Sequence, residues 1–433
     1  MKLVIIAGGK GTRLGLKDIP KPMCPLAGKP LLEHQIELAK RYGLEEVFLL
    51  SGHLAHVIRD YFGDGSRFGI PIRHITEETP MGTAGCLRLL PPMGARFMVL
   101  YGDVVMDCDL GAFMRFDAVF PDSMGTLAVH PNNHPQDSDL LELEDGSSRV
   151  TRILPKPHPL DLDYRNLTNA AAYVFSPAIV DHVAEGEDLA RDVFPRLLAE
   201  GKELRAYATA EYLRDMGTVE RLKDIERDWR AGLIARRNRA IPRPAVFLDR
   251  DGVINPDMGT HPSAEKFQLL PGVEESVRRL NDSDYLSVLV TNQPMIAKGF
   301  VTREEVERTH RRLETLLGRR GAYLDAIFYC PHHPEKGFAG EVPELKTDCS
   351  CRKPKPGMLL EAASRFNIDL PRSWMVGDSA RDMAAGHAAG CRCLGVGAAE
   401  VAGEDEHRPD LPRAVDRILA DRIPADCIRE EAL

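Results

Sequence analysis

The sequence contains no long apolar run. None approaches the roughly 20 residues that a membrane-spanning helix needs, which argues against a spanning protein. The opening residues MKLVIIAGGKG hold only a short apolar run followed by glycines, so no secretory signal peptide is expected. A surplus of basic residues is missing too, because 56 Lys and Arg stand against 65 Asp and Glu. The net charge of −9 argues against partners such as nucleic acid or a membrane surface.

Regular cysteine spacing is also absent. The nine cysteines are an odd number and do not form the framework of a small disulfide-linked domain. We therefore expect a cytoplasmic chain with reduced thiols, some of which bind metal. The sequence has no internal repeats and no long low-complexity segment.

The chain is long enough for two domains. Its 433 residues exceed what one ordinary core supports, and 43% hydrophobic and 28% charged residues are usual for a globular protein. In the first half, apolar strand-like runs at 3–7, 46–52 and 97–103 alternate with a helical pattern over 30–43 that ends at Gly43. This alternation predicts an α/β fold with a mostly parallel sheet.

A second α/β pattern begins after a proline-bounded segment. A charged helix passes into an Arg-rich stretch and then into Pro242 and Pro244. We predict domains at 1–232 and 244–433 with a linker at 233–243, and we interpret the arginines as a solvated helix end rather than a phosphate site. The later pattern predicts strands at 245–249, 286–293, 326–330, 373–378 and 393–397, a helix at 272–280, and a loop over 403–410 before a last helix.

A glycine-rich stretch, AGGKGTRLG, follows the first strand at residues 7–15. Gly8, Gly9 and Gly11 would let backbone N–H groups approach phosphate oxygens that a Cβ would keep away. Arg13 and Lys21 add positive charge. The spacing fits neither a Walker A loop nor a dinucleotide-binding fingerprint, so a structural turn is an equally good interpretation of this stretch alone.

Three further motifs follow in order: PKPMCPLAGKPLLEH at 20–34, PMGTAGCL at 80–87 and LYGDVV at 100–105. Together with the glycine-rich stretch they resemble the sugar-1-phosphate nucleotidyltransferase family over about residues 1–225. The resemblance implies a Rossmann-like domain with a mixed sheet. It also implies that a sugar 1-phosphate oxygen attacks the α-phosphorus of a nucleoside triphosphate, and that pyrophosphate leaves.

The same resemblance gives roles to residues of the first half. The triphosphate would lie on Gly8, Gly9, Gly11 and Arg13, with Lys21 near the α-phosphate and Gly82 near the base. Asp103 and Asp215 would bind Mg²⁺. Taken alone, Asp103 is better explained as a strand-end cap and Asp215 as a helix N-cap. The family resemblance instead favours metal binding by both residues.

Two departures from the family alter the sugar pocket. Pro155 stands in LPKPHP where many relatives carry a sugar-binding Glu, although Lys156 would still meet the sugar phosphate. Asn169 and Tyr173 in NAAAY match a family motif, but Ala171 replaces its glycine. The sugar is therefore less well defined than the type of reaction.

The second half opens with AVFLDRDGVIN at 245–255. Asp249 and Asp251, two positions apart at a strand end, repel each other unless something cationic lies between them. LVTNQ at 289–293, CRKPKPG at 351–357 and MVGDSARD at 375–382 follow in order. These four motifs resemble the haloacid-dehalogenase phosphatase superfamily, which implies a Rossmannoid domain.

In that chemistry, Asp249 would attack phosphorus as the nucleophile. Asp251 would protonate the leaving alcohol and then activate water. Asp378 would complete a Mg²⁺ site with the Asp249 carboxylate and the main-chain carbonyl of Asp251. Asp382 either orients this group or is an ordinary first-turn acid of a helix.

The remaining superfamily motifs supply cations and hydrogen-bond donors. Thr291 and Asn292 would bind phosphate oxygens, and Lys353 would neutralise the nucleophile and the transferring phosphoryl group. Close relatives usually carry Ser-Gly where this chain has Pro294-Met295, and often Lys where it has Ser379. These departures could shift activity or specificity.

A further pattern lies between the motifs, in CPHHP at 330–334 and CSCRKP at 349–354. Cys330, His332, Cys349 and Cys351 form two close pairs, which suits a tetrahedral structural Zn²⁺ in a zinc-binding loop. His333 is a competing ligand, and four unrelated reduced residues are the alternative to a zinc site. The remaining cysteines are interpreted as strand or loop residues (Cys391 and Cys393) and as ordinary thiols (Cys24, Cys86, Cys108 and Cys427).

The zinc pattern joined to DRDGVIN resembles the branch that contains the D-glycero-D-manno-heptose-1,7-bisphosphate 7-phosphatases and the histidinol-phosphatases. There Arg352 would bind the second phosphate of the substrate. The heptose phosphatase would produce a sugar 1-phosphate, which is the substrate type of the first domain. In the pathways of these families, nucleotidyltransferases of this fold make GDP-heptose, whereas ADP-heptose is made by a different transferase fold. By this analogy, the resemblance implies a bifunctional enzyme that removes the 7-phosphate and then forms GDP-heptose from heptose 1-phosphate and GTP.

Two alternatives stay open. The chain could join a mannose-1-phosphate guanylyltransferase, or another nucleotidyltransferase, to a histidinol-phosphate-type phosphatase. The first domain could also be a regulatory nucleotide-sugar-binding module, which Asp103 and Asp215 argue against because binding alone does not require both carboxylates. Mg²⁺ at both sites, Zn²⁺ in the second domain and small-molecule substrates are expected, and a homo-oligomer is possible.

Overall fold

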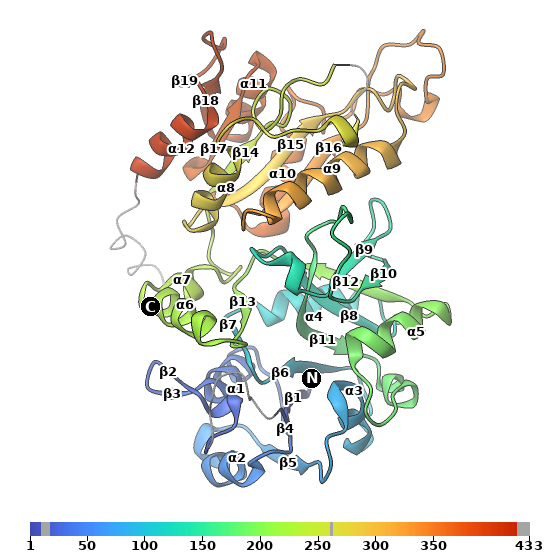
Figure 1. Ribbon diagram of the computed structural model, residues 1–433, viewed down its shortest axis with the longest axis vertical. Coiled ribbons are helices and arrows are strands. Elements are labelled where there is room, and N and C mark those ends of the chain that lie inside the picture. Colours follow the sequence, from blue (N-terminus) through green and yellow to red (C-terminus); the bar gives the residue numbers. More distant parts are fainter. Residues whose placement is uncertain (10–17, 260–262, 422–433) are drawn as a thin grey trace. The chain divides into compact units, whose positions relative to one another are not determined.

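The computed structural model describes residues 1–9, 18–259 and 263–421 (Figure 1). The chain divides into two compact units. Unit 1 consists of Met1–His130, Pro135–Leu160 and Leu167–Ile241, and unit 2 consists of Pro131–His134, Asp161–Asn166 and the chain from Pro242 onwards. Among the described residues, no helix combines the length and the apolar character required to cross a membrane.

Unit 1 is built on a nine-stranded sheet. Its strands are β1 (Leu3–Ala7), β4 (Val47–Ser51), β5 (Ile72–Thr76), β6 (Phe97–Tyr101), β8 (Gly125–His130), β9 (Leu140–Leu143), β10 (Val150–Leu154), β11 (Thr168–Phe175) and β12 (Leu204–Ala208). They lie in the order β10-β9-β11-β6-β1-β4-β5, with β8 paired to both β11 and β12. Strands β6, β1, β4 and β5 are parallel neighbours, whereas β11 runs antiparallel to β6. The mixed sheet that the resemblance implies is confirmed. The mostly parallel sheet expected from the strand alternation is not, because four of the eight described strand pairs of this sheet are antiparallel.

Two short ribbons and seven described helices complete unit 1. The ribbons pair β2 (Pro25–Leu26) with β3 (Lys29–Pro30) and β7 (Val104–Met106) with β13 (Leu213–Asp215). The helices are α1 (Leu31–Arg41), α2 (Ala55–Phe62), α3 (Gly82–Gly85), α4 (Leu110–Ala118), α5 (Phe194–Ala199), α6 (Val219–Arg230) and α7 (Leu233–Arg236). Helix α7 lies inside the segment expected as a linker, and its Ile234 is buried beside Ile225 of α6.

Both faces of the unit 1 sheet are covered. Because side chains alternate along a strand, Leu3 and Ile5 of β1 pack with α1, α2 and α4, while Val4 packs with α3 and α5. A strand buried on both faces must be apolar throughout, which explains why LVIIA is recognisable from the sequence.

Unit 2 contains a six-stranded sheet in which every neighbouring pair is parallel. Its strands are β14 (Ala245–Leu248), β15 (Leu286–Asn292), β16 (Ala326–Cys330), β17 (Trp374–Gly377), β18 (Arg392–Val396) and β19 (Glu406–Arg408), in the order β16-β15-β14-β17-β18-β19. Its helices are α8 (Val273–Asn281), α9 (Arg303–Gly318), α10 (Gly357–Phe366), α11 (Ala380–Ala389) and α12 (Leu411–Ala420). Helices α8, α9 and α12 share one apolar cluster with β14, while α10 and α11 pack on β15 to β18. The predicted α/β architecture is confirmed in this unit too.

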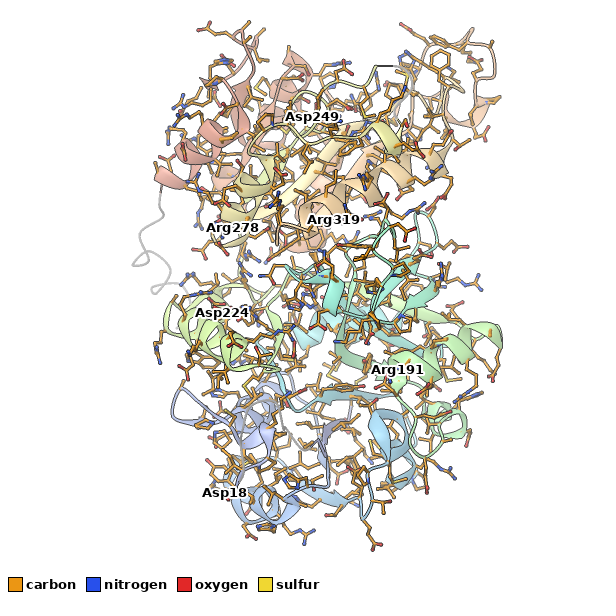
Figure 2. All side chains as sticks on the ribbon, viewed as in Figure 1. Asp18, Arg191, Asp224, Asp249, Arg278 and Arg319 are labelled. Atoms are coloured by element: carbon orange, nitrogen blue, oxygen red, sulfur yellow. The ribbon has the colours of Figure 1, made fainter. Side chains whose placement is uncertain are left out.

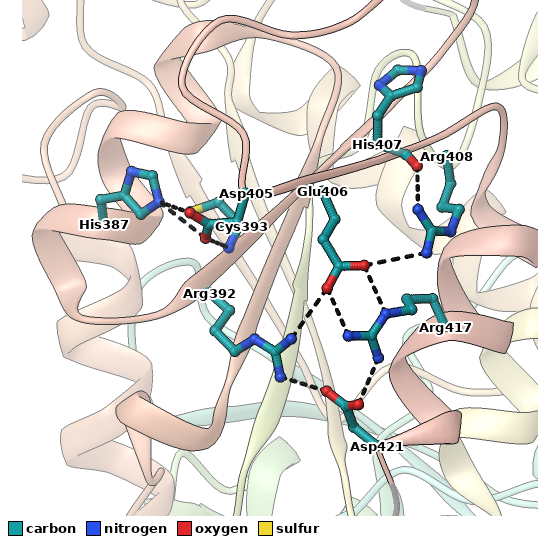
Figure 3. A network of polar contacts seen from close by, with 9 residues as sticks. All are labelled: His387, Arg392, Cys393, Asp405, Glu406, His407, Arg408, Arg417 and Asp421. Carbon is teal, nitrogen blue, oxygen red and sulfur yellow. Dashed lines mark hydrogen bonds and ion pairs between the residues drawn. The ribbon is translucent and has the colours of Figure 1, made fainter.

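Strand β19 corrects the expectation of a loop over residues 403–410. It pairs in parallel with β18, and the Glu406 carboxylate accepts hydrogen bonds from Arg392, Arg408 and Arg417 (Figure 3). The guanidinium of Arg392 also lies 3.7 Å from the centre of the Trp374 ring. An edge strand that is held by charged side chains carries no apolar alternation, so the pattern did not reveal it.

Candidate active sites

The carboxyl edge of the unit 2 sheet gathers most of the residues that the phosphatase motifs single out. Strand β14 lies between β15 and β17, so residues that follow these parallel strands meet at one edge. Asp249, labelled in Figure 2, follows β14, and Asp378 follows β17. Oxygens of Asp249, Asp378 and Asp382 lie within 4.8 Å of one another. Carboxylate oxygens this close fit a hard divalent cation such as Mg²⁺.

Lys353 is the buried cation of this group. Its Nζ lies 2.7 Å from Asp249 Oδ1 and 2.6 Å from Asp382 Oδ1, and it donates to the carbonyl of Val290 at 2.8 Å. The ammonium group therefore makes two hydrogen bonds, to Asp249 and to Val290, and an ion pair with Asp382. Burial raises the pKa of the Asp249 carboxyl to about 7, although Lys353 acts in the opposite direction. The single positive charge of Lys353 therefore compensates the negative charge of the neighbouring carboxylates only in part.

Gly252 makes the close approach of the two strand ends possible. Its φ is +83°, and a Cβ at this position would lie 1.9 Å from Asp378 Oδ2. The turn in DRDG thus requires glycine both for its backbone conformation and for space beside the carboxylate.

The side chain of Asp251 is held by three donors. Its carboxylate accepts from Arg250 at 2.9 Å, from Asn255 at 2.9 Å and from Gln293 at 3.2 Å. Gln293 also donates to the Thr291 hydroxyl oxygen at 3.0 Å. The motif analysis missed the roles of Arg250, Asn255 and Gln293, although all three lie inside DRDGVIN or LVTNQ.

Asn292 is engaged differently from the phosphate-binding role expected of it. Its Oδ1 accepts from the Lys353 backbone N–H at 3.1 Å, and its Nδ2 donates to the Lys353 carbonyl at 3.0 Å. The side chain therefore fixes the backbone that carries the buried lysine. Asp382 likewise has two functions: it caps α11 together with Ser379, and it pairs with Lys353.

Cys330, His332, Cys349 and Cys351 form a compact cluster. The Cys330 sulfur lies 3.5 Å from that of Cys349 and 3.6 Å from His332 Nδ1, and the Cys351 sulfur lies 3.3 Å from the same nitrogen. Ligand atoms around one tetrahedral Zn²⁺, with bonds of about 2.0–2.3 Å, are separated by similar distances. His333 instead packs against Phe338, with ring centres 6.0 Å apart.

His387, Cys393 and Asp405 form a second group of residue types that can bind a metal. Their proximity is explained by the contact between His387 and Asp405. His387 Nε2 lies 3.1 Å from both Asp405 oxygens (Figure 3). The Cys393 thiol donates to the Met383 carbonyl. Cys393 is a buried residue of β18, as expected for a strand thiol. These contacts join α11 to the sheet without needing an ion.

In unit 1, Lys21 meets Asp103. Their Nζ and Oδ2 atoms are 2.5 Å apart, and Lys21 begins a short helical turn that precedes β2. The ribbon of β7 and β13 brings Asp215 opposite Val104, and the Met216 N–H donates to the Asp103 carbonyl at 2.9 Å. The fold thus joins the two aspartates expected to bind Mg²⁺, although they are far apart in the sequence. Asp215 ends β13 and does not cap α6, whose N-cap is Thr218.

A network extends from Asp215 to Lys156. Arg221 lies 2.7 Å and 2.8 Å from the two Asp215 oxygens and 2.9 Å from an Asp137 oxygen. Lys156 Nζ donates to the Asp137 carbonyl at 2.8 Å. Burial alone would raise the pKa of the Asp137 carboxyl, but Lys156 and Arg221 lower it. Arg221 was not identified from the sequence, because a helix-surface arginine carries no motif.

The glycines of unit 1 differ in their surroundings. Gly8 follows β1, and within the part of the chain that the structure describes nothing lies within 4 Å of a Cβ built at the exposed Gly9. At Gly82, φ is +77° and a Cβ would lie 2.3 Å from the Glu187 carbonyl oxygen, so close backbone packing requires glycine there. Gly11 and Arg13 lie outside the described residues.

The NAAAY segment forms part of β11. Asn169 Oδ1 accepts from the Ala171 N–H at 3.3 Å, and Ala171 has a φ of +54°, where the family's glycine would be unstrained. Tyr173 is fully buried and packs against Phe175 and Phe194.

Comparison with known proteins identifies relatives of both halves. The Nucleotidyl transferase family model matches residues 2–231, and a HAD-hydrolase-like model matches residues 350–421. The D-glycero-beta-D-manno-heptose-1,7-bisphosphate 7-phosphatase of Yersinia pestis is 45% identical over 146 residues, which are 34% of this chain and 76% of that protein. The protein of the same name from Escherichia coli K12 is 44% identical over 146 residues, 34% of this chain and 74% of the relative.

Two solved structures also resemble parts of the chain. HddC from Yersinia pseudotuberculosis is 24% identical and covers 53% of this chain and 99% of its own, with a TM-score of 0.46. A D,D-heptose 1.7-bisphosphate phosphatase from B. bronchiseptica is 32% identical and covers 41% of this chain and 99% of its own, with a TM-score of 0.36.

Proposed function

Because the chain belongs to the nucleotidyl transferase family through residues 2–231, and to the family of its heptose-bisphosphate phosphatase relatives, we propose that it is a bifunctional enzyme of GDP-heptose biosynthesis. It removes the 7-phosphate of D-glycero-D-manno-heptose 1,7-bisphosphate. It then transfers GMP from GTP to the heptose 1-phosphate and releases pyrophosphate. The observation that carries this proposal is a lysine against an aspartate at the carboxyl edge of each sheet: Lys21 with Asp103, and Lys353 with Asp249.

In the phosphatase reaction, an Asp249 oxygen attacks phosphorus while Asp251 gives its proton to the leaving sugar oxygen. Asp251 then takes a proton from the water that cleaves the aspartyl-phosphate. Lys353 offsets charge on the nucleophile, and Thr291 offers its hydroxyl to the phosphate. The carboxylates of Asp249 and Asp378, with the main-chain carbonyl of Asp251, would hold Mg²⁺, which supplies further charge neutralisation.

The second phosphate of the substrate would bind at Arg352. This residue is partly buried beside Cys351, and its guanidinium donates to the His332 carbonyl only at 3.4 Å. Arg352 has no ion-pair partner among the described carboxylates, so an anionic ligand would compensate its charge. Zn²⁺ held by the four-residue Cys/His cluster would fix the loop that carries this arginine.

In the transferase reaction, the sugar 1-phosphate oxygen attacks the α-phosphorus of GTP and pyrophosphate leaves. Lys21 would offset charge on the α-phosphate, and Lys156 would meet the sugar phosphate. Asp103 and Asp215 would hold Mg²⁺, which supplies charge neutralisation, once Arg221 releases Asp215. Gly8 and Gly9, with Gly11 and Arg13, would hold the triphosphate, and Gly82 would lie near the base.

Incubation with heptose 1,7-bisphosphate, Mg²⁺ and each nucleoside triphosphate in turn tests the proposal by mass spectrometry of the products. GDP-heptose is expected from GTP. Formation of a different nucleoside diphosphate heptose in its place would contradict guanylyl transfer, and absence of any would contradict the transferase activity. We also propose a cytoplasmic location, which agrees with the free thiols of the eight described cysteines.

A further inference from the structure

Helix α9 of unit 2 carries a buried stripe of polar side chains. Glu307, His310 and Glu314 follow one another at intervals of three and four residues, so they lie on one face of the helix. All three are buried, and His310 has no exposed surface. Burying a carboxylate or an imidazole costs free energy unless the group is paired, so such positions are usually apolar. The stripe therefore needs an explanation beyond packing.

Arg165 compensates the two carboxylates of this stripe. It lies in Asp161–Asn166, a short segment that stands between β10 and β11 in the sequence but belongs to unit 2. Its Nη1 lies 2.9 Å from a Glu307 oxygen, and its Nε donates to Glu314. The two carboxylates start about 10 Å apart along the helix axis, so the guanidinium that meets both lies near the level of His310, between them.

His310 itself contacts the arginine of the DRDG turn. Its Nε2 lies 3.5 Å from Arg250 Nη1, and the centre of its ring lies 5.3 Å from that of the Tyr329 ring. Burial and the charges of Arg250 and Arg165 hold the pKa of His310 well below its usual value, so the imidazole is neutral. Because arginine can only donate, Nε2 is the acceptor and Nδ1 carries the proton.

Arg250 joins His310 to the proposed general acid. Its side chain is almost completely buried, and its Nη2 donates to Asp251 Oδ2 at 2.9 Å. Of the three donors that hold the Asp251 carboxylate, Arg250 is the one that carries a charge. A guanidinium is planar and rigid, so the acceptor that Nη1 meets helps to set the direction of Nη2.

We propose that His310 is a positioning residue of the phosphatase: it orients Arg250, and Arg250 places the Asp251 carboxylate for proton transfer. His310 Nδ1 has no hydrogen-bond partner among the described residues, and a buried polar atom without a partner costs stability. A phenylalanine would pack as well against Tyr329, so the contact with Arg250 accounts for the histidine. Arg165 balances the charge of the stripe that carries it. This inference deepens the proposed phosphatase activity and rests on it.

The test measures phosphatase kcat and KM of the full chain on heptose 1,7-bisphosphate with Mg²⁺. His310→Phe keeps a ring against Tyr329 but removes the acceptor, so kcat should fall about ten- to a hundredfold while KM stays within about threefold. In His310→Gln, Oε1 stands as many bonds from Cβ as Nε2 does and can accept from Arg250, so kcat should stay within about threefold of wild type.

Thr309→Val is the matched control on the same helix. Thr309 is buried as well, and its hydroxyl donates to the Glu305 carbonyl one turn earlier. This variant also changes a buried polar group of α9, and it should keep the wild-type kcat and KM. Nucleotidyl transfer from supplied heptose 1-phosphate should be unchanged in all three variants.

The outcomes separate this inference from the proposed function. If His310→Phe keeps the wild-type kcat, or if His310→Gln loses as much as His310→Phe, the inference is wrong while the phosphatase activity of the wild type stands. If the wild type releases no phosphate from the bisphosphate, the proposed function is wrong and this inference with it. Thermal unfolding checks the fold of each variant. If His310→Phe does not fold, His310→Leu, which is smaller and also lacks an acceptor, must show the same loss of kcat.

Discussion

Single residues of the phosphatase site are fixed by very close contacts. Gly252 has a φ of +83° and no room for a Cβ beside Asp378. Gly252→Ala should lower phosphatase kcat by at least about 100-fold, because it displaces the Asp378 carboxylate, which is proposed to hold Mg²⁺ beside the nucleophile, by a distance of the order of 1 Å. Nucleotidyl transfer from supplied heptose 1-phosphate should persist.

Gly259→Ala is the matched control for that change. Gly259 also has a positive φ, +65°, but no atom of the described residues lies within 4 Å of a Cβ built there. Both variants place an alanine at a positive φ, so both have backbone strain. Only the alanine at position 252 would also collide with Asp378. Equal losses of phosphatase activity in both would contradict the role given to the contact with Asp378.

At position 171 the chain carries alanine where its family carries glycine. The backbone of this alanine is strained. Its left-handed φ of +54° costs an L-residue about 1 kcal/mol, which glycine avoids. Ala171→Gly should therefore raise the free energy of unfolding of unit 1 by about 1 kcal/mol in urea denaturation. Ala172→Gly, at a buried strand position without positive φ, should lower it, and the same sign for both variants would overturn this explanation.

At the residue scale, the sequence predicts which side chains gather but not what each one contacts. The motifs identify Asp249, Asp378 and Lys353, because strand ends of one parallel sheet meet at one edge. The amide of Asn292 binds the Lys353 backbone, and this depends on how a loop 61 residues away returns to the sheet. No local pattern encodes such a contact.

At the scale of elements, the Cys/His cluster joins the end of β16 to the loop that carries Lys353. Purified protein should hold about one Zn²⁺ per chain. Cys349→Ser should lose the metal and destabilise unit 2 more than unit 1, because structural zinc contributes to local folding. Metal analysis and the unfolding of each unit measure both effects.

Cys391→Ser provides the control, since Cys391 is free and lies outside the cluster. It should retain the zinc. Freshly isolated wild-type protein without zinc, prepared without chelator, would contradict the structural metal site.

Elements that are held by buried apolar side chains can be predicted from the sequence, whereas elements held by charged side chains cannot. Strands β1, β4, β14 and β15 are buried and apolar, so their positions follow from the sequence. Helix α1 has the expected amphipathic pattern and ends at Arg41, two residues before Gly43 with its φ of +71°. Strand β19 is held by Glu406 and arginines, and this arrangement is visible only in three dimensions.

At the scale of the whole molecule, the two activities should be separable. Asp249→Asn should abolish phosphate release, because an amide is a poor nucleophile, and leave nucleotidyl transfer from heptose 1-phosphate intact. Asp103→Asn should do the reverse by weakening Mg²⁺ binding. Separate assays of phosphate and of pyrophosphate measure the two reactions, and loss of both activities in either well-folded variant would show that the sites are not independent.

The central claim is that one chain performs two consecutive reactions on one sugar. The phosphatase must then spare the anomeric phosphate, because its oxygen is the nucleophile of the second reaction. Phosphorus NMR of heptose 1,7-bisphosphate with the full-length enzyme and Mg²⁺, in the absence of GTP, follows both phosphates at once. The account predicts that the 7-phosphate signal disappears while the anomeric signal stays. Added GTP should then convert the anomeric signal into that of GDP-heptose, while the β- and γ-phosphates of GTP appear as pyrophosphate. Loss of the anomeric phosphate first, with the 7-phosphate intact, would contradict it.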